Sequence, residues 1–300
     1  MTENEFDARY DFLSEKRLHK LDDGLFRLFR NSVFAIDLLL TNYKNIFPFY
    51  TDHTFEHSEQ VIRYCNIVAG ADILDALCAD ELYILLMGAS LHDIGMGISE
   101  KDFRELSPRV AGMTDYMAAH PGEQLAEYAR AFHQELSGQF IRKYSALFEI
   151  PTPEHIHCIA QVARGHRKAD LLDKTEYPTD YRLPNGQRVN LAYLAALVKL
   201  ADELDITADR NLLFDYNDLN AEWSEKQTMC YKCHGAIKSL GVRSDALVLY
   251  YDTDEPKVEE EILKTRGKVE RTFAEYCEVV RERSSFQNRL HSVLFEQIRP

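Results

Sequence analysis

The dipeptide His92-Asp93 is the pair of residues in this 300-residue chain that most clearly points to chemistry. It follows the run Leu-Tyr-Ile-Leu-Leu-Met at 82–87, which is hydrophobic on every side and predicts a buried helix. A histidine and an aspartate at the end of such a helix are costly unless something compensates them. A divalent metal would do so, because imidazole and carboxylate together suit Zn, Mn, Fe, Ni or Co. We expect Gly95 and Gly97 to end the helix and open a loop that gives the pair access to solvent.

Three further helices are predicted to carry a histidine or an aspartate on an apolar face. In 51–70, His57 and the apolar residues after it are spaced so that they lie on one face of a helix. His166 ends a similar apolar stripe. Asp202 shares a stripe with aliphatic residues in 191–205, near a helix C-terminus, where the helix dipole disfavours an anion. One polar residue on a core stripe would be unremarkable. Here three helices each bring one inward and a fourth ends in His-Asp.

The ordered set His57, His92-Asp93 and Asp202 resembles the HD superfamily of metal-dependent phosphohydrolases, which is defined by His, His-Asp and Asp on an all-helical core. The resemblance covers about residues 20–215. The motifs that carry it are His57-Ser58 with Val61, similar to "HSxxV"; Phe132–Ser137, similar to a segment that brings an extra histidine to the site; and Leu200–Thr207 with Arg210, similar to "ADxxDxxT…R".

The resemblance implies a role for each candidate residue. His57, His92, Asp93 and Asp202 would bind one or two divalent ions, Mn, Fe, Ni, Co or Zn, with Mg also open. His133 and His166 would act as ligands of a second metal, as catalytic acids or as substrate contacts. Asp205, close to Asp202 in the sequence, is expected to orient a ligand or Arg210. Arg164 and Lys168 flank His166 and could contact phosphate oxygens, although their position favours ordinary surface charges.

Known branches of the superfamily differ from this chain at positions that matter for substrate. Met96 stands where the cyclic-dinucleotide branch has a lysine, and Arg167 follows His166 where that branch pairs two histidines. Thr54, Glu203 and Ile206 replace residues typical of the dNTP triphosphohydrolase branch. The chain resembles more closely a less characterised bacterial group, some members of which are linked to conflict or phage defence.

The composition favours a soluble enzyme that acts on a small substrate. Forty-nine acidic and 35 basic residues give a net charge of −14, which argues against a general binder of nucleic acid. The sequence shows no membrane span and no signal peptide, so we expect a cytoplasmic protein without a membrane partner. Homo-oligomerisation is left open. The six cysteines would be reduced thiols.

One cysteine spacing requires a choice between three interpretations. Cys230-Tyr-Lys-Cys233-His234 matches the attachment pattern of c-type haem, but no export signal accompanies it. A structural zinc site lacks a second Cys/His pair at suitable spacing. The interpretation we favour places these cysteines in a strand.

The organisation changes near residue 215. The fold class predicted is mainly α: an all-helical HD-domain core at 1–215, followed by a small α+β appendage at 216–300. The core includes a hairpin at 181–190 with a two-residue Asn185-Gly186 turn and an irregular segment at 99–120. The appendage is expected to hold strands at about 228–251, a long helix at about 256–282 and a short apolar segment at the end.

Function follows from what such a site could do. The leading hypothesis is hydrolysis of a phosphoester or phosphoanhydride of a nucleotide, either a dNTP or a signalling nucleotide, by metal-activated water. His133 or His166 would then protonate the leaving group. The alternative is a non-catalytic HD-fold module that senses a nucleotide. A nuclease acting on single strands is disfavoured, since no stripe of aromatic and basic residues is present.

Overall fold

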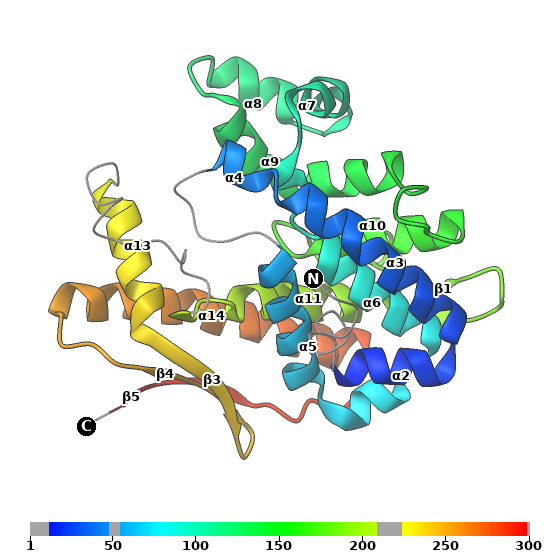
Figure 1. Ribbon diagram of the computed structural model, residues 1–300. Helices are drawn as coiled ribbons and strands as arrows, with labels where there is room; N and C mark the ends of the chain where they lie inside the picture. The colour runs from blue at the N-terminus through cyan, green and yellow to red at the C-terminus, as the bar shows by residue number, and fades with distance from the viewer. Residues whose placement is uncertain (1–11, 48–54, 209–223, 299–300) are drawn as a thin grey trace.

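The computed structural model describes residues 12–47, 55–208 and 224–298. It is mainly helical, as predicted, with short strands and a small C-terminal sheet (Figure 1). The elements, in chain order, are α2 Leu13–Leu21, α3 Asp23–Leu40, α4 Tyr43–Ile46, α5 Phe55–Ala76, α6 Ala79–Leu91, η1 Ile94–Gly97, α7 Glu100–Leu106, η2 Ser107–Arg109, α8 Met113–Ala119, α9 Leu125–Lys143, α10 Pro153–Gly165, β1 Tyr181–Arg182, β2 Arg188–Val189, α11 Leu191–Leu204, α13 Glu225–Ala236, β3 Ile237–Arg243, β4 Ala246–Tyr251, α14 Pro256–Arg283 and β5 Ser292–Gln297.

Helix α6 is the centre of the helical part. Every residue from Asp80 to Leu91 is buried, because the helix packs against α2, α3, α5, α10 and α11 (Figure 1). The apolar run that ends in His92 is therefore the core helix that its all-round hydrophobicity predicts. Helices that deliver the other candidate residues pack directly on it or on each other, so the core and the candidate site share the same elements.

Two glycines let neighbouring helices approach closely enough to bring the candidate residues together. A Cβ on Gly88 would lie 2.6 Å from Cγ1 of Val162, so α6 and α10 touch at this point. A Cβ on Gly95 would collide with the carbonyl oxygen of His133, and the amide of Gly95 donates to Ser137 Oγ at 2.9 Å. The expected open loop at Gly95 and Gly97 is thus wrong, since 94–97 form a 3₁₀ turn with Gly95 packed under α9.

The hairpin at 181–190 is present, with β1 antiparallel to β2. Its turn is wider than the two-residue turn expected from Asn185-Gly186, because Leu183 and Gln187 form the closing hydrogen bond at 3.0 Å. Pro184 has no amide hydrogen and cannot donate the bond that would close a two-residue loop. Gly186 takes the positive φ of +85° that the turn requires. The segment 99–120, expected to be irregular, contains the short helices α7 and α8.

Strands are expected from the sequence at about 228–251, but the first third of that range is helical. Residues 225–236 form helix α13, so the cysteines at 230 and 233 lie on a helix and their placement in a strand is wrong. The cause is a capping box that the sequence already contains: Ser224 Oγ accepts from the amide of Gln227, and the Gln227 side chain accepts from the amide of Ser224.

The small sheet has the order β3-β4-β5. β3 pairs antiparallel with β4, as a hairpin, whereas β5 pairs parallel with β4 after the crossover through α14. The short apolar segment expected at the chain's end is thus the third strand. Figure 1 shows α13 and the sheet gathered at one end of the molecule, with α14 running from there into the helical part.

Helix α14 packs along α11, and its buried residues Val269, Phe273, Tyr276 and Val280 belong to one continuous hydrophobic core with those of α11. The proposed division at residue 215 falls in 209–223, outside the described residues, and stays a prediction. Among the described residues, no single helix is long and apolar enough to cross a membrane; the bent pair Ala79–Gly97 and Glu100–Arg109 passes that test only jointly, by length and composition.

Candidate metal centre

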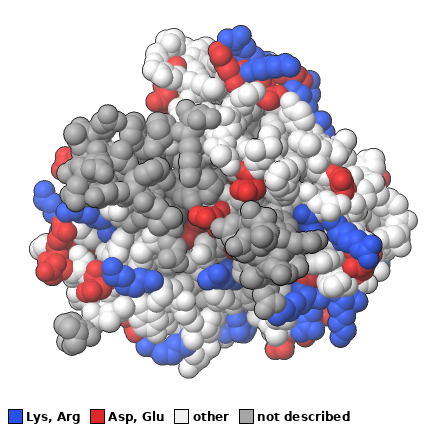
Figure 2. Space-filling view, in the orientation of Figure 1, with Lys and Arg blue, Asp and Glu red and all other residues white. Residues whose placement is uncertain are grey.

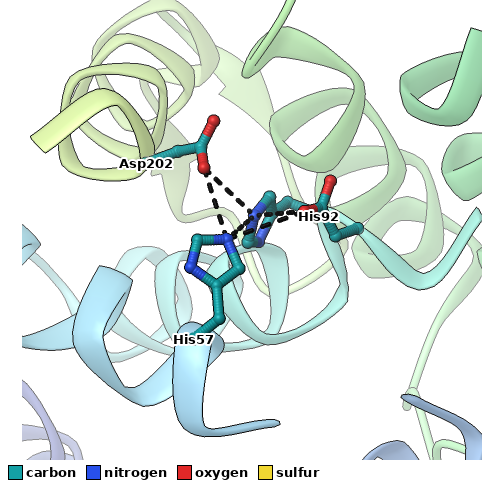
Figure 3. A group of neighbouring side chains, drawn as sticks. His57, His92 and Asp202 are labelled. Atoms are coloured by element: carbon teal, nitrogen blue, oxygen red, sulfur yellow. Dashed lines mark hydrogen bonds and ion pairs between the residues drawn. The ribbon is translucent and has the colours of Figure 1, made fainter. Parts of the chain in front are cut away.

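Five elements direct the candidate residues toward one buried point. His57 comes from the first turn of α5, His92 is the C-cap of α6, and Asp93 precedes η1. His166 is the C-cap of α10, and Asp202 lies in the last turn of α11. Figure 3 shows His57 and Asp202 reaching from α5 and α11 toward His92. Positions separated by as many as 145 residues in the sequence therefore meet in space.

The first group contains His57, His92, Asp93 and Asp202, all buried. His57 Nε2 lies 3.1 Å from His92 Nε2, 3.6 Å from Asp93 Oδ2 and 3.3 Å from Asp202 Oδ1. His92 Nε2 lies 3.5 Å from Asp93 Oδ2 and 3.7 Å from Asp202 Oδ1. Donor atoms that share one ion at about 2.1 Å lie roughly 3.0–3.4 Å apart. The observed spacings of 3.1–3.7 Å are within a few tenths of an ångström of that range, so small side-chain shifts would let the group hold a divalent metal.

The second group contains Asp93, His133 and His166. His133 Nε2 and His166 Nε2 are 3.0 Å apart, and each lies 3.4 Å from Asp93 Oδ1. Asp93 thus turns one carboxylate oxygen to each group. Among the described residues, these two groups are the sets of three or more His, Cys, Asp or Glu donors close enough to share an ion, and they do not include the cysteines at 230 and 233.

Hydrogen bonds on the far side of each ring aim the histidines at the centre. Nδ1 of His92, His133 and His166 faces the carbonyl oxygen three residues earlier, at 2.7, 2.8 and 2.5 Å. A ring that donates from Nδ1 keeps the lone pair on Nε2, which is the nitrogen that points inward. The carbonyls are accessible because α6 and α10 end at His92 and His166, and because α9 is kinked at Phe132, just before His133.

Asp205 orients the fourth ring. Its Oδ2 lies 2.6 Å from Nδ1 of His57, opposite the inward-facing Nε2. Asp205 is the C-cap residue of α11, and its backbone amide donates to the carbonyl oxygen of Asp202. Asp205 is buried, as is Thr207 two residues later. Arg210, the other residue expected beside Asp205, lies outside the described residues.

The charge state of the centre suits metal ligands. Burial alone would raise the pKa of Asp202, but the charge of Arg167 and hydrogen bonds from His57 and His92 hold it well below its ordinary value. Burial lowers the pKa of His133 to about 3 and also lowers that of His166. These two rings are therefore neutral at physiological pH, the state in which an imidazole nitrogen binds a metal.

His92 carries a proton when no cation is bound. Burial disfavours its charged form, but the charge of Asp93 and a hydrogen bond with Asp202 outweigh that effect and raise the pKa of His92 to about 9. Two carboxylates packed together in the core thus require a positive charge beside them. A divalent ion would supply that charge in place of the proton, so the donor set and its electrostatics both fit a metal.

Arg164 and Lys168, considered as phosphate contacts, have other partners. Arg164 bonds Glu135 at 2.7 Å and Glu176 at 2.6 Å. The exposed Lys168 lies 3.3 Å from the carbonyl oxygen of Ala131. In the contacts of the described residues, neither side chain reaches the histidine–aspartate cluster.

Sequence reasoning missed Arg167, whose Nη2 lies 3.7 Å from Asp202 Oδ2. An arginine just beyond a helix end resembles an ordinary surface charge. The available signal was its position directly after His166, a residue on an apolar stripe.

Comparison with known proteins agrees with this geometry. A family model described as HD-CE matches residues 47–279, which include all six residues of the two metal groups and most of α14. No curated protein and no solved structure gives a significant match. This match confirms the HD-type resemblance. Because the family model covers more than half of the chain, the chain belongs to the HD-CE family.

Proposed function

We propose that this chain is a metal-dependent phosphohydrolase that cleaves a phosphoester or phosphoanhydride of a nucleotide. The observation that supports the proposal most directly is the shared carboxylate of Asp93, with Oδ2 facing one group of donors and Oδ1 the other. Divalent ions bound by the two groups would supply Lewis-acid stabilisation of a phosphoryl group. The second group offers three protein donors, which leaves coordination positions for water and substrate.

The chain's own residues would divide the work as follows. His57, His92, Asp93 and Asp202 would hold one ion, and Asp93, His133 and His166 would hold the other. Divalent ions bound there would activate a water molecule and neutralise charge on the phosphoryl group. Asp205 fixes the ring of His57.

The structure favours a ligand role over an acid role for His133 and His166. A general acid needs a pKa near the working pH, whereas burial keeps both rings neutral. Their Nε2 atoms also converge on a single carboxylate oxygen, as two ligands of one ion do. We therefore propose that water or the substrate itself supplies the proton of the leaving group.

A nucleotide is proposed as the substrate because the family resemblance and the acidic composition both favour a small anion over a polymer. On the face shown in Figure 2, acidic and basic side chains of the described residues are interspersed, without an extended basic track of the kind that follows a nucleic acid backbone. The small anion would be attracted by the bound ions rather than by the general surface.

The test is to incubate full-length protein, loaded in turn with Mn, Fe, Ni, Co, Zn or Mg, with a panel of deoxynucleoside triphosphates and signalling nucleotides, and to separate the products by chromatography. We expect cleavage of at least one class, abolished by EDTA and by His92→Ala or Asp93→Ala. His291→Ala, which changes an exposed histidine outside the cluster, is the matched control. Tight nucleotide binding without products under every metal would instead identify a non-catalytic sensor.

A further inference from the structure

The metal centre is buried on most sides, and its most accessible side chains mark one edge. The side chains of His57, His92 and His166 are 0% exposed, and those of Asp93 and Asp202 are 5% and 4% exposed. His133 is 11% exposed and Arg167 is 34% exposed. Among the described residues in contact with the cluster, Arg167 is thus the one that water or a ligand reaches most easily.

The guanidinium of Arg167 has hydrogen-bonding capacity left over. Among the described residues, its ion pair is with Asp202: Nη2 lies 3.7 Å from Oδ2, beyond hydrogen-bonding distance. Its Nε is buried and has no hydrogen-bond partner in the part of the chain that the structure describes. Arg164, one turn earlier, differs because its guanidinium is held by two glutamates at 2.6 and 2.7 Å. An arginine that is partly exposed and not held by a close carboxylate is suited to an anion that binds later.

The carboxylate of Asp202 attracts Arg167. That attraction would be weaker with metal ions bound beside Asp202. Asp202 turns Oδ1 toward His57 and His92 and Oδ2 toward Arg167. Three carboxylates, Asp93, Asp202 and Asp205, serve the centre, so two divalent ions would outweigh them by one positive charge. The attraction between Asp202 and the guanidinium then falls, and the accessible edge becomes positive.

We propose that Arg167 binds the phosphoryl oxygens of the substrate at this edge, and so decides that the centre accepts phosphorylated ligands. The inference rests on the proposed function. A guanidinium presents its N–H donors in a planar fork that matches two oxygens of one phosphate. The two Nη groups would supply that fork, because Nε is buried away from solvent. A lysine would keep the charge but lose the fork.

Inorganic phosphate is the probe, and binding to full-length metal-loaded protein is measured by calorimetry alongside the metal content. Arg167→Gln removes the charge and the fork, and Arg167→Lys removes only the fork. Arg182→Gln, at an exposed arginine of strand β1, is the matched control. We expect Arg167→Gln to keep its metal and weaken phosphate binding by about 10- to 100-fold, the effect of losing hydrogen bonds to a charged group, with a smaller loss in Arg167→Lys and none in the control.

Two results would overturn the inference. One is phosphate binding by folded Arg167→Gln equal to that of the wild type. The other is loss of metal from both Arg167 variants together with loss of phosphate binding, because Arg167 would then act by positioning Asp202. Failure of the proposed function gives a different pattern: the wild type binds phosphate through Arg167 but hydrolyses no nucleotide. Hydrolysis by a wild type whose phosphate binding is insensitive to Arg167 would retain the function and remove the inference.

Discussion

Asp205 Oδ2 lies 2.6 Å from Nδ1 of His57, and the opposite nitrogen of the same ring lies 3.3 Å from Asp202. The last turn of α11 and its C-cap residue therefore act on His57 from both sides: Asp202 would share a bound ion with it, and Asp205 fixes the ring. The affinity for metal should therefore depend on Asp205, although Asp205 contacts the side of the His57 ring that points away from the centre.

Asp205→Ala should lower metal affinity by about 10- to 100-fold, because the His57 ring loses the partner that sets its tautomer and orientation. Asp205→Asn retains an oxygen acceptor and should lose less. Metal titration followed by isothermal calorimetry measures both. Equal affinities in the wild type and Asp205→Ala would show that packing alone orients His57.

Substitutions in the two donor groups should show that each group binds its own ion. His133→Ala removes a donor from the second group only, so the protein should retain the ion of the first group. Asp93→Ala removes the carboxylate shared by both groups. It should weaken the binding of both ions while the chain stays folded. Elemental analysis of protein equilibrated with Mn or Ni checks the stoichiometry. If His133→Ala left the stoichiometry of a dinuclear wild type unchanged, the second group would not be a metal site.

Gly95→Ala should destabilise the protein and disturb the second group. The added methyl group would collide with the backbone of α9 at His133, which cannot move as a flexible side chain can. Overpacking of this kind costs about 1–3 kcal/mol in the free energy of unfolding. Gly122→Ala is the control, because a Cβ there meets nothing within 4 Å. Urea unfolding of both variants decides, and equal stabilities would contradict the close approach.

The buried hydrogen bond between the Asp80 carboxylate and His155 should stabilise the fold except in acid. Burial alone would raise the pKa of Asp80, but hydrogen bonds from His155 and Asn185 lower it below the ordinary value of 3.8. The unfolded chain thus binds this proton at a higher pH than the folded chain. The contribution of the Asp80 carboxylate to the free energy of unfolding is fully present above about pH 4. It is lost as the pH falls through the folded-state pKa of Asp80.

The stability difference between the wild type and Asp80→Asn should accordingly be largest near neutral pH and shrink below about pH 4. Denaturant unfolding across this range measures the difference, with Asp115→Asn, at an exposed carboxylate, as the control. A difference that stays constant down to pH 2 would show that the charge of Asp80 does not contribute.

Helix α14 should be required for folding of the helical part. Phe273 packs in the same core as α11, and Phe→Ala in a core costs about 3–5 kcal/mol. Phe273→Ala should therefore lower the thermal unfolding temperature, and it should do so in a single transition that metal binding also raises. A separate low-temperature transition in the variant, with the metal-stabilised transition unchanged, would show that α14 belongs to an independent unit.

The sequence by itself determined the inner helices and the identity of their polar residues. The all-round hydrophobic run before His92 can only be buried, and the stripes that hold His57, His166 and Asp202 each have one apolar face. A run of local pattern is enough for such predictions, since burial of an apolar face is a property of each helix. The Ser224 capping box was equally local, and it could have predicted α13.

Only the tertiary structure decided how these residues meet. Which oxygen of Asp93 faces which histidine depends on the packing of α10 against α6 at Gly88 and of α9 against η1 at Gly95. The same holds for the arginines. Arg164 and Arg167 are three residues apart and chemically identical, yet the helix ends between them, so one meets glutamates and the other meets Asp202. Local pattern carries no information about partners that lie far along the chain.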